Sequence, residues 1–219
     1  MKAILKQIIY LSFMALLFYG CVSSDGTIKS YINPALISTE ITSVAIFPLR
    51  NAFVQTDVSL GTGDMIEINK MFQSEFVNKN SKTAIINSVS STEMLNQGSL
   101  VDTYSNLLTV YTQTGIPNTE SLRKIGKYLK ADAIIQGFVV KVTQSDGVYS
   151  LFGGSKRGET GITVKYVMFS TNSGDVLWEA TCDGYKGTAT TLEKAPPVSD
   201  VIEIIKNKII TTLPKLSAK

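Results

Sequence analysis

The spacing of the apolar residues in this chain changes repeatedly between the alternation of a β-strand and the three-to-four spacing of an amphipathic helix. Runs typical of strands lie at residues 42–49, 83–87, 133–143, 162–170 and 175–182. With the helical segments, the expected order is β-α-β-α-α-β-β-β-α. Early alternation of strand and helix favours parallel pairing, and the late run of strands favours antiparallel pairing. The pattern predicts an α/β (α+β) fold with one mixed sheet and helices packed on it.

The helical segments carry their own start and stop signals. They are expected at residues 64–79, at 91–113 with a break near Gly98, after 117–120, and at 198–213. Asp64 with Glu67 three residues later matches a capping box. Trp178, Ala180 and Cys182 lie on one side of an alternating strand, so we expect them in the core.

The first 21 residues match a bacterial export signal. Lys2 and Lys6 precede an uncharged stretch of about 12 apolar residues, which is shorter than the ~20 that a membrane-spanning helix needs. Gly20 and Cys21 follow, as in a lipoprotein signal that is cut before an acylated cysteine. We predict a signal peptide at 1–20 and lipidation of Cys21. The alternative is an ordinary signal peptide with an incidental cysteine.

The remaining chain is organised as a tether and one domain. Residues 22–37 mix small, polar and turn-forming types and predict an irregular tether, counted as 21–38 with the lipidated cysteine, that reaches at most about 50 Å. Residues 39–219 are expected to form a single domain. Val22, rather than Asp, follows the cysteine, which favours lipid anchoring in an outer membrane on its periplasmic face.

Charge and residue types exclude several functions. Removal of Lys2 and Lys6 leaves 19 basic residues against 18 acidic ones, so nothing predicts binding to nucleic acid. The chain has no histidine, the usual general base near neutral pH. The glycine-rich stretches 61–64 and 153–158 lack the rest of a nucleotide-binding motif and are interpreted as a helix cap and a hairpin connection. We therefore expect no catalytic, cofactor-binding or metal-binding residues, and no enzyme.

Three apolar residues flank the second glycine-rich stretch. Tyr149, Leu151 and Phe152 either pack beneath the sheet or form a small exposed patch. In the second case they are the candidate partner-contact residues.

Two stretches of the second half resemble the family of curli-secretion-channel (CsgG-like) lipoproteins and their relatives, among them lipoprotein activators of penicillin-binding proteins. The matching positions of the first stretch are Ile125-Gly126-Lys127, Leu129, Ala131-Asp132 and Gly137. Those of the second, a hairpin, are Gly174, Val176 and Trp178. The resemblance implies an α/β domain that oligomerises or docks onto envelope machinery.

The sequence thus predicts a membrane-anchored, non-enzymatic accessory in envelope assembly or secretion. Its expected partners are the membrane, through the N-terminal lipid, and either further copies of itself or an envelope protein. Regulation of a cell-wall (peptidoglycan) synthase is the alternative, and a small-ligand or enzymatic role has no supporting group of residues.

Overall fold

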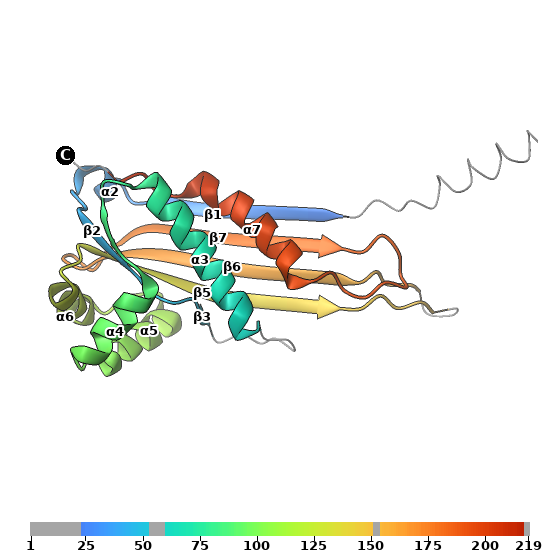
Figure 1. Cartoon of the computed structure of the whole chain (residues 1–219), viewed down its shortest axis with the longest axis horizontal. Helices are drawn as coiled ribbons and strands as arrows, with labels where there is room; N and C mark the ends of the chain where they lie inside the picture. The colour runs from blue at the N-terminus through green and yellow to red at the C-terminus, as the bar shows by residue number, and fades with distance from the viewer. Residues whose placement is uncertain (1–22, 53–59, 151–153, 217–219) are drawn as a thin grey trace, which may run out of the picture.

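The computed structural model of the chain describes residues 23–52, 60–150 and 154–216, and these form one open sheet with helices on both faces (Figure 1). The strands are β1 (Ser24–Ile32), β2 (Ser43–Ile46), β3 (Arg50–Asn51), β4 (Ala84–Ile86), β5 (Ala133–Ser145), β6 (Glu159–Ser170) and β7 (Val176–Gly187). The helices are α2 (Pro34–Ser38), α3 (Thr62–Lys79), α4 (Ser88–Gln97), α5 (Val101–Thr114), α6 (Thr119–Leu129) and α7 (Val198–Thr212).

The strand order is β1-β7-β6-β5-β2-β4, with β3 pairing beside β5. β2 pairs in parallel with β4 and β5, whereas β5, β6, β7 and β1 pair antiparallel in succession. The mixed sheet predicted from the sequence is therefore confirmed, with its parallel first half and antiparallel C-terminal strands. The β6–β7 turn contains Gly174 at φ 84°, a left-handed conformation that favours glycine.

The expectation of an irregular tether at 22–37 is wrong for most of that segment. Residues Ser24–Ile32 form β1, which pairs with β7 from Ser24↔Lys186 to Ile32↔Trp178. β1 is an edge strand with mostly exposed side chains, so it lacks the apolar alternation by which strands are found. A side chain at Gly26 would lie 2.7 Å from Ile204 of α7, so glycine lets this helix pack closely on the strand.

Two helix boundaries refine the expectations. α3 begins two residues earlier than expected, because Gly61 is the N-cap and its N–H donates to Asp64 Oδ2 at 3.2 Å. The break near Gly98 is confirmed, since it separates α4 from α5.

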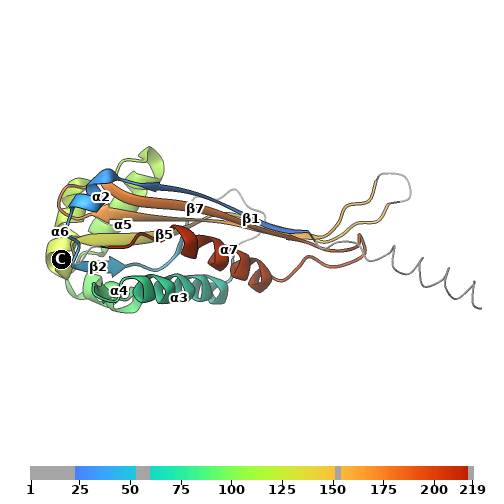
Figure 2. The ribbon, with the colours of Figure 1, turned by 90° about the horizontal axis from the view of Figure 1, so that it is seen from above.

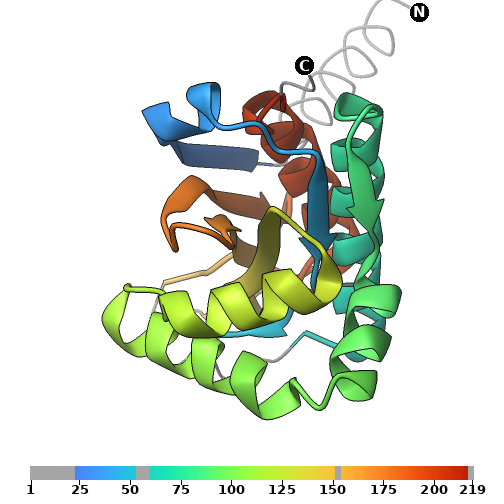
Figure 3. The ribbon, with the colours of Figure 1, turned by 90° about the vertical axis from the view of Figure 1, so that its left-hand side faces the viewer.

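Two layers of core lie on opposite faces of the sheet (Figure 3). α3 and α7 cover one face, where Phe72 and Ile205 are fully buried, and α5 and α6 cover the other with Leu107 and Ile125. Trp178, Ala180 and Cys182 are buried on the α3–α7 side, as expected, and the Trp178 indole N–H donates to the Thr212 carbonyl at 3.0 Å.

The long strands give the molecule two distinct ends (Figure 1). The start of β1, the ends of β5 and β7 and the loop before α7 lie at one end, which we call the hairpin end. α2, α6 and the end of the chain lie at the other. Segments far apart in the sequence therefore meet at the hairpin end.

Candidate functional site

Of the residues that the sequence predicts for lipidation and partner contact, the structure describes only Tyr149. Cys21, Leu151 and Phe152 lie outside the described residues. Tyr149 is 59% exposed, so this side chain does not pack beneath the sheet, and its part in a partner contact stays a prediction.

The β5–β6 hairpin continues beyond the last regular pair, Ser145↔Glu159. Val148 and Lys156 form an antiparallel bridge with two hydrogen bonds, 2.8 Å from the Val148 N–H and 2.9 Å from the Lys156 N–H. The backbone that carries Val148 and Tyr149 is therefore held in a defined position.

The loop at 188–197, between β7 and α7, packs against this hairpin. The Gly147 N–H donates to the Glu193 carbonyl at 3.0 Å, and the Ala195 N–H donates to Asp146 Oδ1 at 2.8 Å. A Cβ at Gly147 would lie 2.5 Å from the Thr191 carbonyl oxygen. Only glycine permits this approach of two backbones.

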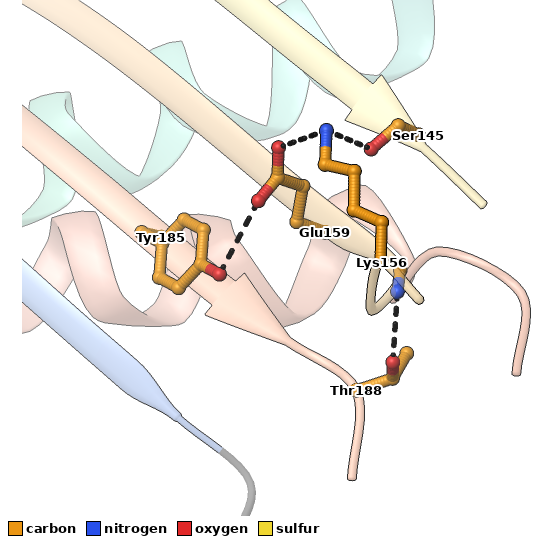
Figure 4. A network of polar contacts seen from close by, with 6 residues as sticks. Ser145, Lys156, Glu159, Tyr185 and Thr188 are labelled. Atoms are coloured by element: carbon orange, nitrogen blue, oxygen red, sulfur yellow. Dashed lines mark hydrogen bonds and ion pairs between the residues drawn. The ribbon is translucent and has the colours of Figure 1, made fainter. Parts of the chain in front are cut away.

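Thr188 joins the same two segments through a pair of hydrogen bonds. Its N–H donates to the Gly158 carbonyl at 2.8 Å, and its hydroxyl oxygen accepts from the Gly158 N–H at 3.0 Å (Figure 4). Both loops therefore form one hydrogen-bonded unit.

Charged side chains at this end interact with one another. Lys156 Nζ lies 3.0 Å from Glu159 Oε1 and 3.4 Å from Ser145 Oγ, while the Tyr185 hydroxyl donates to Glu159 Oε2 at 3.5 Å (Figure 4). The lysine side chain is 61% exposed, so this ion pair contributes little to stability.

Apolar side chains project from the same unit. Val148 is 56% exposed, Tyr149 59% and Leu192 80%. The backbone of Gly147 contacts that of Thr191 and Glu193. Val148 follows Gly147, and Leu192 lies between Thr191 and Glu193, so these two apolar residues come from neighbouring segments. We call Val148, Tyr149 and Leu192 the apolar tip. Leu192 was not predicted, because it is a single apolar residue in a polar loop and only folding brings it to the hairpin.

The chain enters the domain at this same end. The Gly187 N–H donates to the Ser23 carbonyl at 2.8 Å, next to the Ser24↔Lys186 pair. Cys21 precedes Ser23 by two residues, which span at most about 7 Å.

A groove lies between α3 and α4, away from the apolar tip. It encloses about 720 Å³ and is lined by Leu49, Met65, Ile66 and Val89 among others. Asn69, 7% exposed, donates to Ser88 Oγ at 2.9 Å, and its Oδ1 has no hydrogen-bond partner among the described residues. No sequence motif marks this groove, because two separate helices form it.

Asp132 has a role that the sequence did not predict. Its carboxylate accepts from the N–H groups of Thr42 (2.8 Å) and Ser43 (3.0 Å) at the start of β2. Partial burial acts to raise the pKa of this carboxyl, but the hydrogen bonds from Thr42 and Ser43 outweigh it and hold the pKa below its usual range.

The buried titratable groups of the core are held in their neutral forms. Burial raises the pKa of the Tyr104 and Tyr166 phenols, and it raises the pKa of the Cys182 thiol to about 12. The Tyr104 hydroxyl donates to Gln136 Oε1 within the core. The Tyr166 hydroxyl, in contrast, has no hydrogen-bond partner among the described residues.

The described part of the chain has two further properties. It contains no group of three or more cysteine, aspartate or glutamate side chains placed to hold a metal ion. None of its helices combines the length and the apolar character needed to cross a membrane.

Comparison with known proteins relates the chain to solved structures. No family model and no curated protein matches the sequence. The chain is similar to the PelC dodecamer from Paraburkholderia phytofirmans, at 15% identity over 89% of this chain and 99% of that chain, with a TM-score of 0.49. It is similar to lipoprotein GNA1162 from Neisseria meningitidis (11% identity, 78% and 96% covered, TM-score 0.42) and to the LpoB C-terminal domain from Escherichia coli (12%, 68% and 92%, 0.39). A lipoprotein is therefore among the structures that it resembles.

Proposed function

We propose that this chain is a bacterial lipoprotein, anchored through Cys21 in the outer membrane and facing the periplasm. In this proposal it is a non-enzymatic accessory in envelope assembly or secretion. The observation that carries the proposal is the basic, apolar, Gly20-Cys21 sequence, which ends three residues before β1. Two or more acyl chains on one cysteine hold a protein stably on a membrane.

The short connection restricts where the domain acts. With β1 beginning at Ser24, the stretch available as a tether falls from the expected 50 Å to about 7 Å between Cys21 and Ser23. The domain then lies beside its membrane and meets partners there. This counts against the alternative, regulation of a cell-wall synthase, because such a partner has to be reached across the wall.

The mode of action in this proposal is self-association or docking of an envelope protein. The long, mostly exposed edge strand β1 supplies surface for contact rather than for catalysis. The assignment to the curli-channel family belongs to this proposal as well.

Lipid labelling tests the anchor. Cells that express the full chain are fed labelled palmitate, and Cys21→Ser is compared with Cys182→Ala, the matched change at the other cysteine. We expect Cys21→Ser to lose the label and to leave the membrane fraction, while Cys182→Ala keeps both. Label that persists in Cys21→Ser contradicts the proposal.

Cross-linking in native membranes tests the accessory role. Purification after cross-linking is expected to recover a homo-oligomer or a complex with an envelope protein. Recovery of the monomer alone contradicts action through self-association or docking.

A further inference from the structure

The apolar tip lies at the hairpin end, the same end of the domain at which the chain arrives from the proposed lipid anchor. The backbone before β1 pairs with the end of β7 through Ser23 and Gly187, and β7 leads directly into the loop that carries Leu192. Figure 2 shows the start of β1, the hairpin and this loop together at one end of the sheet. A lipid on Cys21 therefore places this end, and no other, against the bilayer.

The chemistry of the tip suits a lipid surface. Val148, Tyr149 and Leu192 project from backbone that hydrogen bonds hold in place, so their exposure is built into the structure. Tyrosine, with an apolar ring and a polar hydroxyl, is enriched at membrane–water interfaces. Three acidic groups near the tip have polar partners: Asp146 accepts from the Ala195 N–H, Glu159 pairs with Lys156, and Glu193 Oε1 accepts from the Thr190 hydroxyl.

We infer that the apolar tip, formed by Val148, Tyr149 and Leu192, inserts into the interfacial region of the membrane that holds the lipid anchor. The sheet then stands with its strands directed away from the bilayer and with α2 at the distant end. Nine residues of β1 separate the two ends by about 30 Å. This inference rests on the anchoring of Cys21 proposed above.

The occupant is a lipid surface rather than a protein for a geometric reason. Ser23 follows Cys21 by two residues, a chain length of at most about 7 Å, so a protein of ordinary size has no room between the tip and the bilayer. The nearest apolar phase is the membrane itself.

A fluorescent label on the full, lipidated chain tests the orientation. Leu192→Cys receives a thiol-reactive NBD dye, and Ile37→Cys in α2 is the control, since Leu192 is 80% exposed and Ile37 79%. The label is selective because Cys21 is acylated and Cys182 is buried with its pKa raised to about 12. Both proteins are reconstituted into phosphatidylcholine vesicles with and without brominated acyl chains.

We expect brominated lipid to remove roughly half of the emission at position 192, because an interfacial group lies at the boundary of the acyl chains. The label at position 37 is expected to keep its emission. Equal quenching at both positions, or a blue shift at 192 without quenching, which a protein contact produces, overturns the inference.

Flotation of the same vesicles separates this inference from the anchoring proposal. Protein that floats without selective quenching overturns the inference alone. Protein that does not float overturns the anchoring proposal and this inference with it.

Discussion

The N–H of Gly187, the last residue of β7, donates a 2.8 Å hydrogen bond to the carbonyl of Ser23, the residue before β1. This bond extends the β1–β7 ladder to the first residue that the structure describes. The described chain is therefore joined to the sheet from Ser23 onward, and it enters the domain at the hairpin end.

Gly26→Ala tests whether β1 is a structural strand. The added Cβ would lie 2.7 Å from Ile204, so α7 has to move, and we expect a loss of about 1–2 kcal/mol in the free energy of unfolding. Urea unfolding followed by Trp178, the only tryptophan, measures it. Gly63→Ala is the control, because a Cβ there meets nothing within 4 Å. Equal stability of the two variants contradicts the pairing of β1.

Gly147→Ala is expected to separate the two loops of the hairpin end. Its Cβ would lie 2.5 Å from the Thr191 carbonyl, and both partners are backbone, so the hydrogen bond to Glu193 has to lengthen or break. Hydrogen exchange of the loop 188–197 is expected to rise, while exchange in α3 and α7 stays unchanged. A loop with native protection contradicts the described packing.

Asp132→Asn is expected to destabilise the protein near neutral pH by about 1 kcal/mol, because an amide accepts more weakly than a carboxylate from the N–H groups of Thr42 and Ser43. The folded pKa lies below the ordinary value of 3.8, so the carboxylate contributes stability above that pH. This contribution is lost as pH falls below 3.8 and through the folded pKa. Unfolding midpoints measured across this window should converge for wild type and variant. A constant difference at all pH values contradicts this role of the carboxylate.

The Cys182 thiol is expected to resist modification in the folded protein. Burial, together with the nearby Asp183 carboxylate, raises its pKa to about 12, and the side chain is fully buried. A thiol reagent at mildly alkaline pH should react only at the rate of global unfolding, and at once in denaturant. Rapid reaction of the native protein contradicts the packing of α7 over β7.

The elements with strong apolar periodicity could be predicted, and those without it could not. β5, β6 and β7 carry buried residues along most of their length, and their strand character and antiparallel order follow from sequence. β1 was missed because it is a polar edge strand that forms only where β7 offers an unpaired edge. β3, two residues long, is too short to leave a pattern.

The residues of the candidate site also differ in whether a local sequence pattern marks them. Tyr149 was found because it adjoins a local cluster of apolar residues, whereas Leu192 lies more than forty positions away in a loop with no such cluster. The groove beside Asn69 likewise has no local signal. Residues that are brought together only by folding produce no pattern in a short stretch of sequence.

By itself, the sequence determined the class of fold, the mixed sheet and the burial of Trp178, Ala180 and Cys182, and it predicts an export signal at residues 1–20. These depend on local periodicity and short motifs, which act through neighbouring residues. Tertiary structure decided that residues Ser24–Ile32 form a strand, and it brought the hairpin and the loop before α7 together at the start of this strand. Those outcomes depend on which backbone groups remain unpaired once the other strands have assembled, and on the close approach that Gly26 and Gly147 permit.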